Sequence, residues 1–225
     1  MNNYLSKTTL VLFFLLMHFY SNAQDLSIGI TGGGIFSNQK IENEAIDLLN
    51  IDYDTKNRFS WQAGLLLDLE VESNVTVQPG LLFSNKGYRY EDEDDGFEIE
   101  TKSKPLYLHI PVPVLLFHEL DNIKIYGGAG PYVSFGIGGE IETDGEILNF
   151  GFDDEGDIDW GSDDSDNYKT TDVGIVLNAG VRKDNLQLGL AYDLGLRNIA
   201  PNADEDNIAR NRSFSINIAY FFAIE

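Results

Sequence analysis

Acidic side chains dominate the chemistry that is open to this chain. Its 225 residues include 37 Asp and Glu against 15 Lys and Arg, which gives a net charge of −22. The densest acidic runs are Glu91–Asp95 and Asp153–Asp159. Clustered carboxylate oxygens can bind Ca²⁺ or Mg²⁺, although neither run has the spacing of a calcium-binding loop. Two readings of these runs therefore stay open, weak divalent-cation binding and plain solvated charge, whereas the acidic balance excludes nucleic acid as a partner.

Basic side chains indicate a different chemistry, the recognition of phosphate groups. Arginine and lysine are the usual protein partners of phosphate. Eight of them fall near the same ends of the strands predicted below and would form a basic collar, namely Lys56, Arg58, Arg89, Lys102, Lys104, Lys169, Arg210 and Arg212. The alternative is that these residues only offset nearby acids.

Motifs for catalysis are missing from the sequence. There is no Gly-x-Ser-x-Gly, no His-Glu-x-x-His and no glycine-rich phosphate loop that opens a helix. With no cysteine the chain has neither a disulfide nor a thiolate metal site, and only three histidines are present. We therefore predict a protein that is not an enzyme and that carries no cofactor.

The elements that must position these charges are strands, because apolar residues recur at every second position. In Leu186–Leu196 the even positions are leucine or tyrosine, and the odd positions are small or polar. This period of two is typical of a strand with one apolar face. It predicts eight strands, at Leu26–Phe36, Phe59–Val71, Val75–Asn85, Leu106–Phe117, Ile123–Ile137, Asp172–Arg182, Leu186–Arg197 and Ser213–Ile224.

The connectors between these strands alternate between short and long. Three are tight and rich in turn residues, namely Glu72–Asn74, His118–Asn122 and Lys183–Asn185. Four are long, namely Ser37–Asn57, Tyr88–Ser103, Gly138–Tyr168 and Asn198–Ala209. Short turns on one side and long loops on the other are typical of transmembrane barrels.

The direction of the apolar face separates a membrane barrel from a soluble one. The apolar face holds too many large residues for a narrow eight-stranded lumen, and the opposite face is rich in glycine. Aromatic residues gather near the strand ends, as in an interfacial girdle. We therefore expect an all-β, eight-stranded, antiparallel up-and-down transmembrane β-barrel, with a soluble secreted barrel as the alternative.

Four charged residues are predicted to face the lumen at the end with the tight turns: Asp68, Glu70, Lys124 and Arg182. Charges inside a barrel are tolerable only when they are paired, so we expect an ion-pair cluster that plugs the interior. The functional alternative is a gated pore. His109 and Asp193 also point inward and are expected to be members of a hydrogen-bond network rather than a catalytic pair.

Prolines interrupt the regular pattern in two neighbouring strands. Pro79 lies in the third predicted strand, and Pro111 and Pro113 lie in the fourth. Proline removes a ladder donor, and a closed barrel has no edge to accommodate that loss. We expect a bulge or a frayed ladder there.

The first 23 residues have the features of an export signal. Lys7 supplies a positive charge, Leu10–Tyr20 is apolar but too short for a ~20-residue membrane span, and Ser21–Ala23 offers small residues for cleavage. A retained anchor is the alternative. We predict a signal peptide at residues 1–23 and one barrel domain at residues 24–225.

Several strand motifs carry a resemblance to a known family: Tyr107–Phe117, Gly128–Ser134, Asp172–Gly174 and Gly180–Val181. The chain resembles the outer membrane protein β-barrel domain family, also called porin-family proteins, which is similar in architecture to the small OmpA-like and OmpX-like barrels of Gram-negative bacteria. The resemblance implies no catalytic residues. One departure is the C-terminus, because such barrels tend to end on an aromatic residue, whereas Phe222 is followed here by Ala223–Glu225.

Together these patterns predict a non-enzymatic structural or surface-interaction protein of the outer membrane, and the alternative is a narrow porin for ions or small solutes. The acidic loops would face outside and both mature termini would be periplasmic. Outer-membrane lipid and lipopolysaccharide are the expected partners, and the basic collar would bind the lipopolysaccharide phosphates. Divalent cations are a further candidate at the acidic loops. The barrel is expected to be a monomer.

Overall fold

The computed structural model describes residues 25–43, 55–94, 97–147, 150–163, 165–201 and 207–224. The predicted signal peptide at residues 1–23 lies outside the described residues. Every regular element in the described ranges is a β-strand. Within these ranges no helix has the length and apolar character needed to cross a membrane.

All described strands belong to one antiparallel sheet. They are β1 (Asp25–Asn43), β2 (Arg58–Glu72), β3 (Val75–Val77), β4 (Gly80–Asn85), β5 (Tyr88–Asp94), β6 (Phe97–Pro111), β7 (Val114–Leu120), β8 (Ile123–Ile147), β9 (Phe150–Asp157), β10 (Thr171–Lys183), β11 (Leu186–Gly195) and β12 (Asn207–Ala223).

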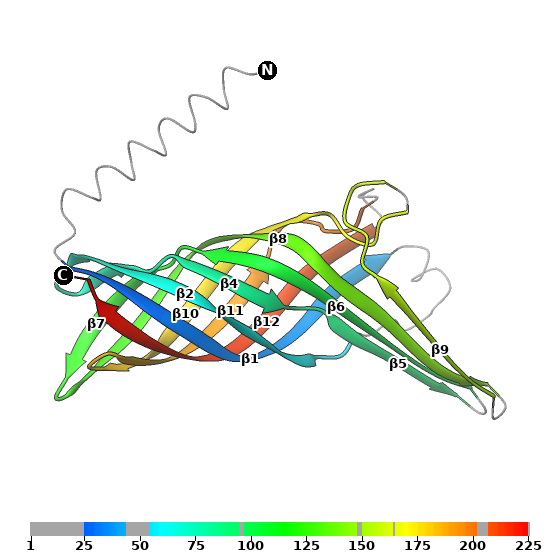
Figure 1. Cartoon of the computed structure of the whole chain (residues 1–225), viewed down its shortest axis with the longest axis horizontal. Helices are drawn as coiled ribbons and strands as arrows, with labels where there is room; N and C mark the ends of the chain where they lie inside the picture. The colour runs from blue at the N-terminus through cyan, green and yellow to red at the C-terminus, as the bar shows by residue number, and fades with distance from the viewer. Residues whose placement is uncertain are drawn as a thin grey trace, which may run out of the picture.

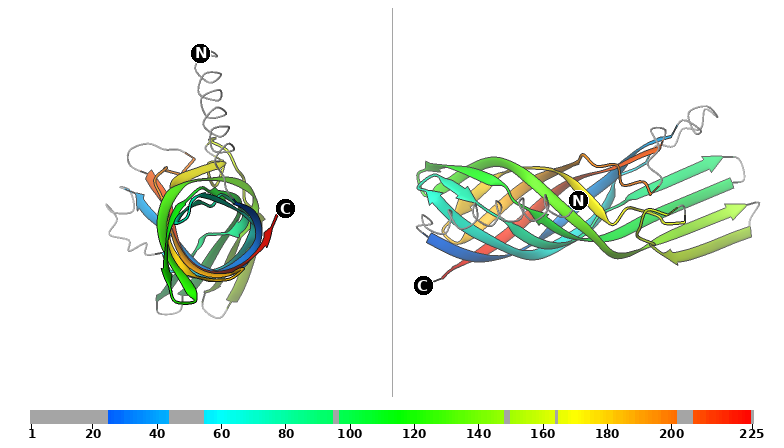
Figure 2. Two further views of the ribbon diagram at one scale, coloured as in Figure 1. Left: turned by 90° about the vertical axis from the view of Figure 1, so that its left-hand side faces the viewer. Right: turned by 90° about the horizontal axis from the view of Figure 1, so that it is seen from above.

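The sheet closes on itself as a barrel, because β1 pairs with β2 on one side and with β12 on the other. Viewed down its axis, the barrel is a closed ring (Figure 2, left). The strands β3 and β4 share one wall, and β6 and β7 share the next, so the ring has eight walls. The predicted eight-stranded antiparallel barrel is confirmed.

Proline explains why two walls are each split into two strands. Pro79 separates β3 from β4, and Pro113 separates β6 from β7. The carbonyl groups of these prolines still accept hydrogen bonds from neighbouring walls, with Leu67 N 2.8 Å from Pro79 O and Gln78 N 3.0 Å from Pro113 O. The ladder is therefore interrupted at the expected positions, while the ring stays closed.

The apolar face of the ring points outward. Phe59 is 65% exposed and Ile218 is 57% exposed, whereas Tyr107, on an inward position of β6, is fully buried. At one level Tyr192, Phe214, Phe36 and Phe59 stand side by side on four successive walls. At the other end of β12, the rings of Tyr220 and Phe222 pack against each other with their centroids 5.0 Å apart. This is the inverse of a soluble core and matches a lipid-facing wall with two aromatic girdles.

One end of the barrel carries the tight hairpins and is called here the turn end. The turns lie at Ser73–Asn74, Asp121–Asn122 and Asp184–Asn185, and Asp121 and Asp184 have positive φ angles of 54° and 51°. The three predicted short connectors are thus confirmed as hairpin turns. The beginning of β1 and the end of β12 lie at this same end of the barrel (Figure 1).

The opposite end differs from the prediction. Residues 88–103 and 138–168 were expected to be long loops, but the acidic runs within them form strands β5, β6, β8 and β9. The order β5-β6-β8-β9 makes a four-stranded sheet, called here the projection, that extends beyond the ring (Figure 1; Figure 2, right). The physical reason is that charged residues alternate with apolar or small ones in Phe97–Lys104 of β6 and Glu140–Ile147 of β8, which pair at the centre of this sheet, and β5 and β9 pair along their outer edges.

The two faces of the projection differ in chemistry. Cross-strand register places Tyr88 beside Ser103 and Ser103 beside Ile141, on the face that continues the lumen. Glu140, Glu142 and the lysines opposite them continue the outer wall. A bulge at Ile137 of β8 and a positive φ of 133° at Gly139 keep the apolar residues on the inner face.

Candidate functional site: the lumen and the outer rim

An arginine closes the turn end of the lumen. We call Arg182 and its partners Asp68, Gln187 and Gln78 the inner plug. Arg182 on β10 donates two hydrogen bonds to Asp68 on β2, at 2.7 and 2.9 Å. Its Nε donates to Gln187 at 3.0 Å, and Gln187 in turn contacts Gln78. The guanidinium lies 4.6 Å from the Phe117 ring centroid and 4.5 Å from that of Phe221.

The structure brings together only two of the four residues predicted for the lumen ion-pair cluster. Asp68 and Arg182 form a half-buried ion pair. Lys124 instead lies near the surface and pairs with Glu119 at 3.3 Å. Glu70 lines an open cavity of about 570 Å³ together with Lys124 and Arg182, and no ion pair within the described ranges joins it to either of them.

The middle of the lumen contains a charged residue that the sequence reasoning missed. Lys86, in the break between β4 and β5, is 1% exposed and places Nζ 2.9 Å from Asp193 Oδ2. His109 Nε2 lies 3.5 Å from the same oxygen, and Ser134 Oγ lies 2.8 Å from His109 Nδ1. We call these four residues the central cluster. Lys86 was missed because it follows the end of a strand, where the alternation does not define a direction.

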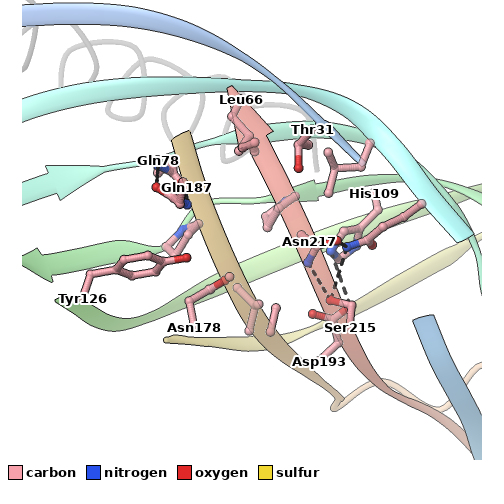
Figure 3. A pocket seen from close by; sticks show the side chains of 18 residues that line it. Thr31, Leu66, Gln78, His109, Tyr126, Asn178, Gln187, Asp193, Ser215 and Asn217 are labelled. Atoms are coloured by element: carbon pink, nitrogen blue, oxygen red, sulfur yellow. Dashed lines mark hydrogen bonds and ion pairs between the residues drawn. The ribbon is translucent and has the colours of Figure 1, made fainter. Parts of the chain in front are cut away.

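The order Ser134–His109–Asp193 is that of a hydrolytic triad, but the surroundings do not fit hydrolysis. Ser134 is fully buried and Asp193 is held by the Lys86 ammonium. The neighbouring cavity has a volume of only about 60 Å³, which is room for a few water molecules. Figure 3 shows His109 and Asp193 pointing into this cavity with Ser215 and Asn217 from β12. The expected role of His109 and Asp193 as network members agrees with this geometry.

A second polar layer lies between the central cluster and the projection. Asp172 accepts hydrogen bonds from Tyr132 at 3.2 Å and from Asn211 at 3.0 Å. Asn211 also contacts the Tyr107 hydroxyl at 3.3 Å and accepts a hydrogen bond from Gln39 at 3.0 Å. These side chains come from five different walls, so they tie the barrel together across its interior.

The end of the lumen below the projection is closed by aromatic rings, which we call the mouth cap. Trp160 packs against Tyr107 with centroids 5.1 Å apart and against Tyr168 at 5.9 Å. Its ring lies so close to Gly136 that a Cβ on that residue would approach it to 2.2 Å. Tyr168 hydrogen-bonds Ser103 at 2.8 Å, and Ile158, Ile199, Ala200 and Ala209 complete an apolar cluster.

The basic collar is divided by the structure into paired and unpaired members. Lys56 pairs with Glu91, Arg89 with Glu91 and Glu100, Lys102 with Glu100 and Asp144, and Lys104 with Glu140 and Glu142. These four residues lie on or beside the projection and offset its acids. Arg58 donates to the Asn85 side chain and the Lys86 carbonyl, and Lys169 donates to the Asn198 carbonyl. Arg210 and Arg212 have no ion pair among the described residues.

Three carboxylates of the projection come close enough to bind one cation. The nearest oxygens of Glu140, Glu142 and Glu155 lie within 4.8 Å of one another. The ammonium of Lys104 lies 2.8 Å from Glu140 and also contacts Glu142. Because this lysine already supplies the positive charge, the geometry gives divalent-cation binding, one of the two readings of the acidic segments, no added support.

The charge of Lys104 should determine how the projection responds to pH. Hydrogen bonding to Lys104 lowers the pKa of Glu140. Burial alone would lower the pKa of the Lys104 ammonium, but its hydrogen bonds to Glu140 and Glu142 outweigh burial and raise it. The Glu140 pair therefore stabilises the fold above the ordinary glutamate pKa of about 4.3, and this contribution is lost as the pH falls through the depressed value.

We predict that Lys104→Gln reverses this pH response. Without the lysine the carboxylates of Glu140, Glu142 and Glu155 repel one another at pH 7, and protonation near pH 4 relieves them. Hydrogen-exchange protection of the β8 and β9 amides should thus be lower than in the wild type at pH 7 and should rise on acidification. Lys183→Gln, which removes an exposed lysine at the turn end, is the matched control. Equal protection of the wild type and K104Q at pH 7 would contradict the prediction.

Three solved structures of outer-membrane and surface proteins are among those to which this chain is similar. Ail, the attachment invasion locus protein of Yersinia pestis, is 12% identical over 88% of this chain and 100% of that chain, with a TM-score of 0.39. The outer membrane protein OprG from Pseudomonas aeruginosa is 12% identical over 89% and 97%, with a TM-score of 0.42. Neisserial surface protein A is 9% identical over 88% and 97%, with a TM-score of 0.40. No curated protein matches the chain significantly.

The sequence itself carries the stronger identification. The model of the family described as "Outer membrane protein beta-barrel domain" matches residues 22–200. This span covers most of the chain, from the predicted cleavage point to the segment that completes the mouth cap. The fold, the outward apolar face and this match agree, and the chain belongs to the outer membrane protein beta-barrel domain family.

Proposed function

We propose that this outer-membrane barrel is a closed, non-conducting and non-enzymatic anchor that presents the charged projection as an interaction surface. The observation that carries the proposal is the filling of the lumen at three successive depths. The inner plug, the central cluster and the mouth cap each span the interior with side chains from opposite walls. An eight-stranded barrel has room for little more than such side chains.

The orientation of the barrel is part of the proposal. The turn end would face the periplasm, together with both mature termini, and the projection would lie outside the cell. Short turns at one end and long strands at the other support this direction, because outer-membrane barrels have short periplasmic turns and long external segments. The dense negative charge of the projection also suits exposure to water.

A non-enzymatic role is supported by where the reactive groups lie. The histidine and serine that could form a nucleophile, His109 and Ser134, are 2% and 0% exposed. Within the described ranges, the rim at the projection end carries lysines and arginines beside carboxylates but no histidine. That set can bind and screen charge.

A narrow pore is the second candidate, and one observation favours it. The open cavity of about 570 Å³ at the turn end reaches Arg182, and the smaller cavity of about 60 Å³ lies within the lumen and is lined by Gln187. Inner-plug residues line both spaces, Gln187 and Gln78 the smaller one and Arg182 the larger one, so movement of the Arg182 side chain is the step that a pore would require. The mouth cap would still close the far end.

Planar-bilayer recording separates the two candidates. We predict no steady unitary conductance for the wild-type barrel, with insertion verified by heat-modifiable gel mobility and by protease shaving of the projection. An open porin added to the same membrane afterwards serves as the positive control. Steady openings whose size changes in Arg182→Ser would place the ion path through the inner plug and would overturn the closed-barrel proposal.

A further inference from the structure

One sector of the outer wall combines aromatic and basic residues in an order suited to a membrane interface. Across β11, β12, β1 and β2, the register aligns Tyr192, Phe214, Phe36 and Phe59 in one exposed row. Aromatic rows of this kind sit where the hydrocarbon ends and the lipid headgroups begin. The residues directly beyond the row must therefore meet the headgroups.

Two arginines occupy that position on β12. Arg212 and Arg210 follow Phe214 toward the projection end at two-residue steps, which places them on the same face about 7 and 14 Å along the strand. Arg212 is exposed and Arg210 is half-buried. Their neighbours in register are Asn38 and Lys40 on β1 and Leu194 on β11, so no acid lies directly opposite either arginine.

These arginines differ from the four acid-paired members of the collar. Lys56, Arg89, Lys102 and Lys104 are each neutralised by carboxylates of the projection. Within the described ranges Arg210 and Arg212 form no ion pair, and Arg212 is exposed on the outer face of β12. A guanidinium group at headgroup depth with unused donors is suited to an anion that approaches from the membrane.

We propose that Arg210 and Arg212 bind the phosphate of an anionic outer-leaflet lipid headgroup. The aromatic row supplies the apolar contact for the acyl chains, and the guanidinium groups supply paired N–H donors for the phosphate oxygens. The projection, on the other side of the barrel mouth, is acidic and repels the same headgroups. The site is thus confined to the β11–β12–β1 sector, which we call the arginine face, rather than spread around the whole collar.

The test compares lipid retention by folded barrels in nanodiscs that contain bisphosphorylated lipid A, fully dephosphorylated lipid A or phosphatidylcholine. The full mature chain is used as the wild type, as R210Q/R212Q and as K56Q/K102Q. The last variant removes the same charge from the acid-paired part of the collar and is the matched control. Lipid A that stays bound after repeated detergent exchange is quantified by mass spectrometry.

We expect the wild type to retain the bisphosphorylated lipid in preference to its dephosphorylated form. Loss of each arginine should lower retention about fivefold, the effect of one basic residue at an anionic membrane surface, while K56Q/K102Q should stay near wild type. Equal retention by R210Q/R212Q and the wild type would overturn the assignment, and so would an equal drop in the control. Equally tight binding of inorganic phosphate and of bisphosphorylated lipid A by the wild type would show that the site takes a free anion and would overturn the lipid assignment.

Discussion

Lys86→Met is expected to lower the free energy of unfolding by about 3–5 kcal/mol, the cost of breaking a buried ion pair by removing one partner. The lysine is 1% exposed, and its ammonium lies 2.9 Å from Asp193. Methionine keeps the volume but leaves the carboxylate buried without its cation. His109 and Ser213 still contact Asp193, at 3.5 and 3.2 Å, but neither supplies the full charge of the lysine.

Urea titration of the barrel refolded in detergent micelles measures this cost, with tryptophan fluorescence and gel mobility as parallel readouts. The double variant K86M/D193L should recover most of the loss, because replacing both partners of a buried pair by apolar residues is often neutral. Lys183→Met, at an exposed lysine, controls for the substitution itself. A loss below about 1 kcal/mol for Lys86→Met, the range of a solvated surface pair, would show that the central cluster is solvated rather than buried.

Ile218→Arg should destabilise the barrel in lipid by about 2–4 kcal/mol, the cost of arginine on the lipid face at the bilayer midplane. Ile218 is 57% exposed and lies midway along β12 between Phe214 and Phe222. In a soluble protein an exposed isoleucine could be replaced by arginine with little effect. The size of the loss in the free energy of unfolding therefore tests whether the apolar face points toward lipid.

Ile224→Arg is the matched control for depth. Ile224 is exposed and lies beyond Phe222 at the turn end, where the same substitution should cost only about 0–1 kcal/mol. Both variants are compared with the wild type by denaturant titration in phospholipid vesicles. Equal and small effects at the two positions would contradict a lipid-facing wall, because a depth-dependent cost arises only in a bilayer.

The ring could be predicted from the sequence because a period of two is a local signal. In β12 a large apolar residue stands at every even position from Phe214 to Phe222, and the structure exposes each of them. Pro79 and Pro113 could be placed for the same reason, since the loss of a ladder donor depends on residue type alone. These features needed no knowledge of which walls are neighbours across the lumen.

The projection could also have been found, because Phe97–Lys104 and Glu140–Ile147 alternate between charged residues and apolar or small ones. The density of acids hid that pattern and favoured a loop. Carboxylates are poor strand formers in general, but β-propensity depends strongly on the face that a residue occupies. Here the acids face outward, while Tyr88 and Ile141 pack toward the mouth cap.

Contacts across the lumen could be predicted only in part. Arg182 and Asp68 lie 114 positions apart in sequence, yet their strands face each other across the ring, and the symmetry of eight strands was enough to suggest the pair. The prediction that Lys124 and Glu70 join this pair was wrong. The tilt of the strands determines which residues lie at the same depth in the barrel, and the alternating pattern of the sequence gives no information about that tilt. The position of Lys86 inside the lumen depends on both the strand tilt and the break in the wall after β4.

The margins of the projection bear on how copies of this protein coexist in a crowded membrane. Strand β9 has no partner other than β8 among the described residues, and its exposed residues include Asp153, Asp154, Glu155 and Asp157. Unpaired backbone N–H and C=O groups along a strand edge can form hydrogen bonds with an edge strand of a neighbouring copy. The carboxylates oppose this at separations within the physiological screening length of about 8 Å, so that lateral packing of the barrels becomes sensitive to ionic strength.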